Sequence, residues 1–304
     1  MHDNTFHIAV RVSSSNTYQA PYTAAGLGDR IHLITVAWAY ANTHSCSVVL
    51  NISSNGISVE KKQSFLEILK LFPEGKIGLK FHDYIGINEI HWHEYLERKG
   101  ITAKTFYYGD HLGRFEKKYG FDISPYLRNF PKLNNLDIPR PQLILPDRFI
   151  TVQWDASGST RTLNSDIQLQ IMRRYQDIGY ESISVGGKST HFSSNYPLAN
   201  AAYAVSKAEL HVGVDSGFMH LAFLYLDYSK IHIYANPNGY WSHHLFRAYE
   251  NGCIQNFMHE KPSYLQKIRI KAVYDTQIIN KIFFSHPMLL NFIRRFGKSF
   301  RAKN

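Results

Sequence analysis

The chain has 304 residues, of which 44% are hydrophobic and 19% charged, proportions that are ordinary for a folded protein and exclude an intrinsically disordered one. Its formal net charge of +10 favours anionic partners such as nucleotide phosphates, an acidic glycan or lipid, or nucleic acid. Two cysteines exclude a disulfide framework and indicate a reducing compartment. No apolar run reaches the roughly 20 residues that span a bilayer, and the N-terminus lacks a secretory signal, so we expect a cytoplasmic protein.

The first half of the chain predicts strands that alternate with helices. Strands are expected at 6–12 and 47–52, and helices at 31–41 and 61–71. The run 31–41 is apolar nearly all round, which is typical of a helix buried against a sheet. Residues 76–137 are rich in aromatic side chains and histidine and lack a clear period, so we expect pieces of strand and loop there.

A proline-rich linker separates the two halves. Three prolines between Pro139 and Pro146 resist both helix and central strand, which predicts domains at 1–145 and 146–285. In the second half, strands are expected at 149–154, 180–185, 210–214 and 230–234, and helices at 165–178, 197–206 and 221–226. Alternating strands and helices with short loops predict parallel sheets, and such sheets bind ligands at the carboxyl ends of their strands.

Each half carries one glycine–acid turn between an expected strand and an expected helix. The first is Ala25–Arg30 and the second is Val212–His220. A helix N-terminus has unpaired backbone N–H groups and partial positive charge, so it favours anions, and glycine lets the backbone approach a ligand closely. Two such turns predict two faces of one cleft, of which one holds a phosphorylated donor and the other the chemistry.

Both turns also have a purely structural interpretation. Asp29 would cap its helix by accepting backbone N–H bonds, or it would act as a general base toward a hydroxyl in the cleft. The segment 215–220 would be a helix cap followed by a core histidine, or the seat of a diphosphate. The cluster His91–Glu94 has a metal-like composition but lacks the convergent ligands of a zinc site, and we expect no metal.

The C-terminal residues 286–304 predict a basic amphipathic helix. Pro287–Arg301 places apolar side chains on one face and arginine and lysine elsewhere. This pattern occurs in helices that lie on an anionic membrane and in helices that pack on the body of a protein with a solvated basic face. The sequence leaves both interpretations open.

The two turns resemble the motifs of one family. The segment Gly26–His32 looks like the N-terminal glycine–aspartate motif of the heptosyltransferase-like glycosyltransferases, and Val214–Ala222 is similar to that family's C-terminal signature. The resemblance implies an α/β protein of the GT-B fold, with two Rossmann-like domains whose parallel sheets face a central cleft. It also implies inverting, metal-independent sugar transfer from a nucleoside-diphosphate sugar, without a cofactor.

The resemblance assigns expected roles to individual residues. Asp29 matches the catalytic base, with Gly28 and Arg30 on the acceptor side, and Asp215 matches the donor-sugar contact. The expected donor and phosphate side comprises Ser157, Ser159, Thr160, Arg161, Ser216, Gly217, Phe218 and His220. Arg161 stands where the family carries a lysine and would clamp phosphate oxygens in bidentate fashion. Gly186, Gly187 and Lys188 are expected near the base and ribose.

The resemblance thus implies a hexosyl- or heptosyltransferase of bacterial lipopolysaccharide or capsule synthesis. Its partners would be a nucleotide sugar, a glycan or lipid-linked glycan acceptor and, through the tail, the inner membrane. A non-catalytic nucleotide- or glycan-binding protein and a sugar epimerase of similar build are the alternatives. Nucleic acid is not expected as a partner, because no recognised motif occurs and the basic residues are scattered except at the tail.

Overall fold

The structure is a computed structural model that describes residues 4–12, 26–55, 57–86, 88–107, 116–123, 126, 132–133, 138, 144–156, 161–187, 197–234, 252–253 and 255. The expected tail helix at 286–304 lies outside the described residues, as do the linker residues 139–143. The predicted domain boundary at 145 therefore stays a prediction.

The first half forms a five-stranded parallel sheet in the order β3-β2-β1-β4-β5. The strands are β1 (Thr5–Val10), β2 (Ser47–Ser53), β3 (Ile77–His82), β4 (Ala103–Tyr107) and β5 (Gly120–Asp122). Helices α1 (Leu27–Thr43), α2 (Val59–Leu69), α3 (Glu89–Arg98) and α4 (Glu116–Tyr119) connect them. The central strand β1 pairs with β2 from Thr5↔Ser47 to Val10↔Ile52.

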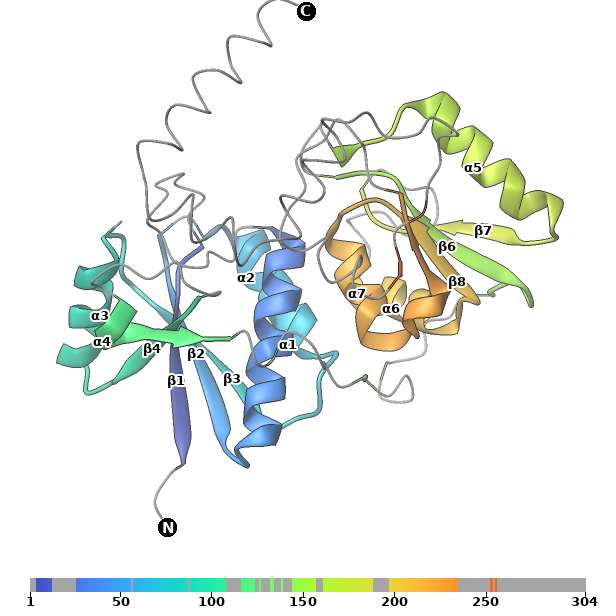
Figure 1. Cartoon of the computed structure of the whole chain (residues 1–304). Coiled ribbons are helices and arrows are strands. Elements are labelled where there is room, and N and C mark those ends of the chain that lie inside the picture. Colours follow the sequence, from blue (N-terminus) through green and yellow to red (C-terminus); the bar gives the residue numbers. More distant parts are fainter. Residues whose placement is uncertain are drawn as a thin grey trace, which may run out of the picture.

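Helices cover both faces of this sheet because successive strand residues point to opposite sides. Ile8 and Val10 belong to the core cluster that contains the buried residues of α1. Ala9, between them, packs instead with Trp92 and Leu96 of α3. Figure 1 shows α1 and α3 on different sides of β1. Burial on both faces explains why the central strands carry continuous apolar runs.

The expectation of only strands and loops in 76–137 is wrong, because α3 and α4 lie in this range. The side chain of Asn88 caps α3 by accepting the N–H groups of Ile90 and His91 at 2.9 and 3.3 Å. Gly100 follows the helix with a left-handed φ of +74°, a conformation that glycine adopts readily at helix ends. Caps at both ends, and not an apolar period, define this helix.

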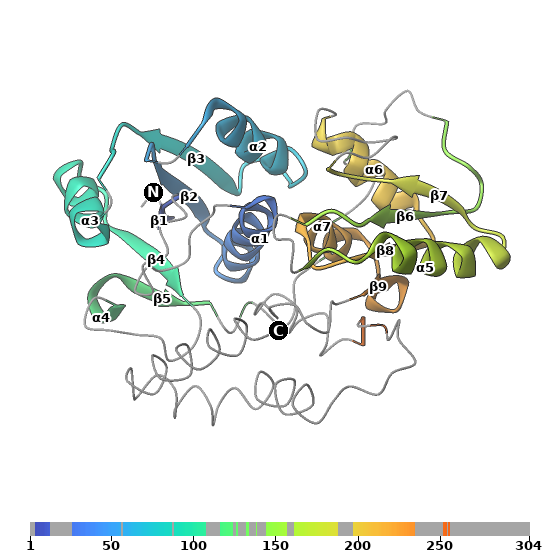
Figure 2. The same cartoon turned by 90° about the horizontal axis from the view of Figure 1, so that it is seen from above.

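The second half forms a four-stranded parallel sheet in the order β7-β6-β8-β9. The strands are β6 (Phe149–Gln153), β7 (Glu181–Ser184), β8 (Leu210–Gly213) and β9 (Ile231–Ile233). The helices are α5 (Ser165–Asp177), α6 (Leu198–Lys207), α7 (Gly217–Tyr225) and the short 3₁₀ helix Tyr228–Lys230. Helix α5 packs on one face through Ile171 and Tyr175, and α6 and α7 cover the other (Figure 2).

The two halves meet through α1 and α7, which lie side by side in both views (Figures 1 and 2). A β-carbon added at Gly28 of α1 would lie 2.8 Å from His220 Cδ2 and 3.3 Å from the Gly217 Cα of α7. The rings of His32 and His220 contact each other with centroids 5.8 Å apart. A second contact joins α2 to α6, where Glu67 Oε2 accepts the backbone N–H of Leu198 at 3.2 Å. Buried residues of α1, α6 and α7 accordingly belong to one core cluster.

We expect Gly28→Ala to destabilise the protein by about 2 kcal/mol, because the new methyl group would crowd a packed contact. The neighbouring atom on Gly217 is backbone, which cannot rotate away. Urea denaturation would measure the change. Gly78→Ala is the matched control, since a β-carbon there meets only Val49 Cγ2 at an ordinary 3.5 Å. Equal stability of the two variants would show that the helices do not need the glycine.

The predicted α/β class with parallel strands is confirmed. Most observed elements match the expected ones to within one or two residues, a normal difference at element ends. Two helices begin earlier than predicted, because α1 starts at Leu27 and α7 at Gly217. Gly28 and Asp29 therefore lie in the first turn of α1 and Gly217 begins α7, whereas Asp215 and Ser216 still precede their helix. Among the described residues, no helix has both the length and the apolar character that crossing a membrane requires.

Candidate functional site

A cavity of about 360 Å³ lies where the N-terminal turns of α1 and α7 meet. Both glycine–acid turns contribute to its wall, together with the loops that follow β6 and β7. The lining residues are Gly26, Leu27, Gly28, Asp29, Gln153, Asp155, Ala156, Arg161, Gly187, Asp215, Ser216, Gly217, Phe218 and His220. The structure thus brings together two turns that stand almost 190 positions apart in the chain.

Asp29 lies in the first turn of α1 and lines the cavity. Its Oδ2 accepts the backbone N–H of Gly26 at 2.8 Å, which satisfies one of the donors exposed at this helix end. The predicted structural role of Asp29 is therefore confirmed. The same carboxylate stands half-buried at the cavity wall, so its position is compatible with the predicted role as a base.

The two residues expected on the acceptor side lie in different places. Gly28 lines the cavity and forms the contact with α7. Arg30 points away from it and is 7% exposed, with its guanidinium 5.7 Å from the ring centroid of Phe65 on α2. Burial lowers the pKa of Arg30, and the Coulombic effect of Asp29 opposes that shift. Arg30 is not among the residues that line the cavity.

Asp215 and Arg161 meet at another part of the cavity wall. Asp215 is 3% exposed in the turn between β8 and α7. The Nη1 atom of Arg161 lies 3.7 Å from Asp215 Oδ2 and donates to the Asp215 backbone oxygen at 3.4 Å. The replacement for the family's lysine therefore reaches the turn that the resemblance assigned to the donor. Ser157, Ser159 and Thr160, which precede Arg161, lie outside the described residues.

The N-terminus of α7 is open toward the cavity. Ser216 occupies the cap position, but its side chain makes no capping hydrogen bond. The buried Ser216 Oγ has no hydrogen-bond partner among the described residues, although the residue is only 7% exposed. Gly217, Phe218 and His220 follow on the cavity wall. An uncapped helix start with a buried, unsatisfied hydroxyl is suited to receive an anion.

The glycines expected near base and ribose differ in position. Both adopt left-handed conformations, with φ of +76° at Gly186 and +55° at Gly187. A β-carbon at Gly186 would lie 2.3 Å from the Phe218 ring, so this glycine permits close packing under the site. Gly187 lines the cavity itself. Lys188 lies outside the described residues.

Three cavity residues at the end of β6 were not predicted. Gln153 ends β6, Asp155 and Ala156 follow it, and all three line the cavity. The signal that would have identified Gln153 and Asp155 is their place in the chain, because polar residues at the carboxyl end of a parallel strand lie where such sheets bind ligands.

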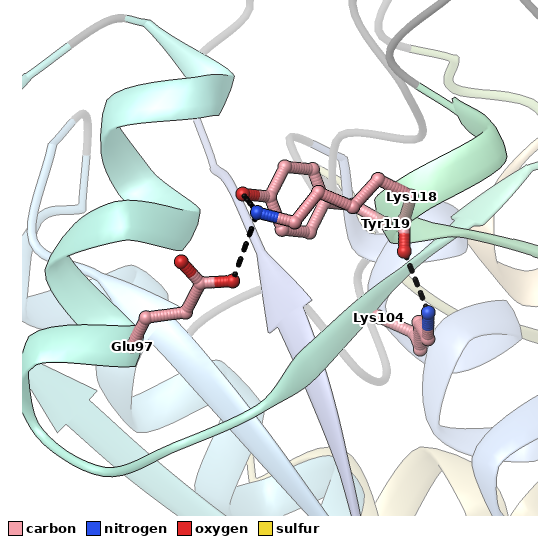
Figure 3. Close-up of polar contacts among 4 residues, drawn as sticks. All are labelled: Glu97, Lys104, Lys118 and Tyr119. Carbon is pink, nitrogen blue, oxygen red and sulfur yellow. Dashed lines mark hydrogen bonds and ion pairs between the residues drawn. The ribbon is translucent and has the colours of Figure 1, made fainter.

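The histidine cluster on α3 is part of a structural network. Buried His93 has its Nε2 2.8 Å from Thr105 Oγ1 and stacks on Tyr119 with ring centroids 4.2 Å apart. Figure 3 shows the adjacent polar contacts, in which Lys118 Nζ lies 3.4 Å from Glu97 Oε1 and Lys104 Nζ donates to the Lys118 backbone oxygen at 2.6 Å. Within the described ranges, no group of three or more His, Cys, Asp or Glu side chains is placed to hold a metal ion.

Burial of His93 makes the stability of the protein depend on pH. Burial lowers the pKa of His93 to about 4, whereas an unfolded histidine titrates near 6.5. The unfolded state therefore binds more protons below about pH 6.5, and stability falls as pH decreases from there toward 4. We expect His93 to account for a loss on the order of 3 kcal/mol over this range.

Denaturation of His93→Gln at pH 7 and pH 4.5 would measure this loss, because glutamine can still bond to Thr105 without titrating. The variant should show a weaker pH dependence than the wild type. Exposed His91 on the same helix provides the control variant His91→Gln. If both variants keep the wild-type pH dependence, His93 is not its source.

Comparisons with known proteins find no matching family model and no matching curated protein. Solved structures are similar at low sequence identity. TibC from enterotoxigenic Escherichia coli, described as an iron-containing dodecameric glycosyltransferase and also solved with ADP-D-β-D-heptose, matches with a TM-score of 0.49, 14% identity and 86% of this chain covered. This chain spans 64% of the length of TibC.

For two further similar structures, the match extends over nearly the whole length of those proteins. The E. coli ADP-heptose lipopolysaccharide heptosyltransferase II matches with a TM-score of 0.44 and 11% identity, over 90% of this chain and 100% of that one. A family 9 glycosyltransferase from Veillonella parvula matches with a TM-score of 0.42 and 12% identity, over 89% of this chain and 98% of that one. All three proteins are described as glycosyltransferases.

Proposed function

We propose that this chain is a glycosyltransferase of GT-B architecture that moves a sugar from a nucleoside-diphosphate sugar to a hydroxyl group of a glycan or lipid-linked glycan. The observation that carries the proposal is the shared cavity, in which Asp29 from one half and the 215–220 turn from the other line the same space. A carboxylate and an open helix N-terminus on one cavity are the two groups that such a transfer requires.

The donor diphosphate would bind at the wall formed by α7 and Arg161. Its charge would be stabilised by the backbone N–H groups at the start of α7 and by the guanidinium of Arg161. When the bond from the sugar to the diphosphate breaks, negative charge grows on the departing oxygen. Groups already oriented toward that oxygen stabilise the transition state more than the ground state.

Asp29 would take the proton of the acceptor hydroxyl as its oxygen attacks the anomeric carbon. Attack from the side opposite the diphosphate inverts the configuration at that carbon, as the family resemblance implies. The helix start and Arg161 would meet the charge of the leaving group without a metal ion, and the donor is a substrate, so the proposal includes no cofactor.

The acceptor and the location belong to the same proposal. A net charge of +10 suits a phosphorylated or acidic glycan, as in lipopolysaccharide or capsule precursors made at the cytoplasmic face of the inner membrane. The basic tail at 286–304 would hold the enzyme near anionic lipid.

A non-catalytic nucleotide-binding protein is the second candidate, and one observation favours it. Asp29 already caps α1 through Gly26, so this carboxylate has a structural reason to be present without any reaction. This candidate shares the donor site and lacks only the transfer step.

A thermal-shift screen of nucleoside diphosphates and nucleotide sugars tests the donor site. A ligand at 100 times its Kd stabilises the folded state by about 2.7 kcal/mol, which shifts the melting temperature measurably. Transfer assays with the best ligand and lipid-linked glycan fractions then separate an enzyme from a binding protein. A screen in which no nucleotide raises the melting temperature would contradict both candidates.

A further inference from the structure

The wall of the cavity at the end of β6 carries hydrogen-bond acceptors that no motif explains. Gln153 is the last residue of β6 and is 4% exposed, and Asp155 stands two positions later at the surface of the cavity. The family resemblance assigns a role to neither residue.

The amide of Gln153 makes one hydrogen bond, which orients it, and its other polar atom has no partner among the described residues. Its Nε2 donates to the backbone oxygen of Asp155, which fixes the amide so that the other atom is the oxygen. That oxygen, Oε1, is buried and has no hydrogen-bond partner among the described residues. A buried acceptor without a donor is costly and rare in folded proteins, so this amide oxygen calls for a donor from a ligand.

The carboxylate of Asp155 lies directly over the turn that follows β7. A β-carbon at Gly187 would stand 2.1 Å from Asp155 Oδ2, and Gly187 has a left-handed φ of +55°. Glycine at 187 therefore leaves the space that the carboxylate fills. The negatively charged carboxylate of Asp155, a hydrogen-bond acceptor, therefore stands at the junction of β6 and β7, next to the amide of Gln153.

The two walls of the cavity thus differ in chemistry. Arg161 and the start of α7 offer positive charge and N–H donors, whereas Gln153 and Asp155 offer acceptor oxygens. A phosphate would be repelled by Asp155 and attracted to Arg161. A hydroxyl group, by contrast, can donate to either an amide oxygen or a carboxylate.

We infer that Gln153 and Asp155 form a subsite that binds sugar hydroxyl groups of the donor. The inference rests on the proposed function, because it places the uncharged polyol part of a nucleoside-diphosphate sugar beside a diphosphate at α7. The hydroxyl groups belong either to the ribose of the nucleotide or to the transferred sugar.

Calorimetric titration of the full chain tests this subsite and separates the two sources. The probes are ADP, GDP, CDP and UDP, their 2′-deoxy and 3′-deoxy forms, and the nucleotide sugars ADP-glucose, GDP-mannose and UDP-glucose. The variants are Gln153→Leu and Asp155→Ala, and the matched control is Asp177→Ala, an exposed carboxylate on α5 outside the cavity. Asp155 is exposed, so its variant reports on the subsite even where Gln153→Leu folds poorly.

We expect each variant to weaken binding of the fully hydroxylated ligand about tenfold. Affinity for the ligand that lacks the contacted hydroxyl should stay unchanged, because a side chain and a hydroxyl that interact lose the same contact whichever of them is removed. If the variants lose affinity for the ribose nucleotides but not for the deoxyribose forms, the subsite binds ribose. If they lose affinity only for the nucleotide sugars, it binds the transferred sugar.

Equal losses for all probes, or no loss, would overturn the subsite and leave the proposed function standing. A wild-type chain that binds none of the probes would overturn both.

Discussion

Asp29→Asn is expected to slow sugar transfer by a factor of about 10²–10⁴, the usual contribution of a positioned general base, while donor affinity stays within about twofold of the wild type. The amide oxygen of asparagine can still accept the N–H of Gly26, which Asp29 Oδ2 accepts at 2.8 Å. The helix cap is therefore kept, and what is lost is the capacity to take a proton. Product formation at saturating donor, together with calorimetric donor binding, measures the two effects separately.

The control for this variant is Asp166→Asn. Asp166 is also an acidic residue in the first turn of a helix, α5, but it is exposed and lies outside the cavity. Both substitutions remove one charge near a helix N-terminus, so they should lower stability similarly, by less than about 1 kcal/mol. If Asp29→Asn retains wild-type turnover, Asp29 is a structural cap and the assignment of the base is wrong.

The sequence was most informative where local chemistry and packing favour the same structure. Strands such as Phe149–Gln153 are apolar because they are buried on both faces, and the side chain of Asn164 marks the start of α5 by accepting the N–H of Asp166. The glycine–acid turns predicted one shared site because helix starts follow strand ends in a parallel sheet. The structure places both turns on one cavity.

Other features depend on contacts that no local pattern contains. Helix α3 was missed because its buried face is made of Trp92, His93 and Leu96, a mixed set without a simple apolar period. Arg30 was expected beside the acceptor because it follows Asp29 in the motif. Its helical position turns it instead toward Phe65 of α2. The place of Gln153 and Asp155 at the end of β6 indicates a ligand site, but the contact of Asp155 with the turn at Gly187 depends on how β6 and β7 come together.

The contact between α1 and α7 also depends on tertiary structure that no local sequence pattern contains. Gly28 and Gly217 were predicted to let the backbone approach a ligand, but the structure shows that they also let two helices approach each other. A change at either glycine would therefore act on stability as well as on ligand binding. For this reason neither glycine is a clean probe of the reaction, and the charged residues of the cavity are better ones.

Arg161→Leu is expected to weaken binding of a nucleoside diphosphate by about 10- to 100-fold, because charge-assisted hydrogen bonds to phosphate contribute about 1.5–3 kcal/mol. Binding of the matching nucleoside, which carries no phosphate, should not change. The variant should also unfold more easily by roughly 2 kcal/mol, since it removes the positive charge 3.7 Å from the carboxylate of Asp215, a residue that is 3% exposed.

The double variant Arg161→Leu with Asp215→Asn separates these two effects. Asp215 is buried and Arg161 partly so, and removing both charges of such a pair costs less stability than removing one, so the double variant should recover most of the lost unfolding free energy. It should not recover diphosphate affinity, because the group that binds phosphate is still absent. Denaturation and calorimetry on the same samples measure both quantities. Affinity that returns together with stability would show that Arg161 acts only by holding the Asp215 turn in place, and the phosphate would then have to be bound by the start of α7 alone.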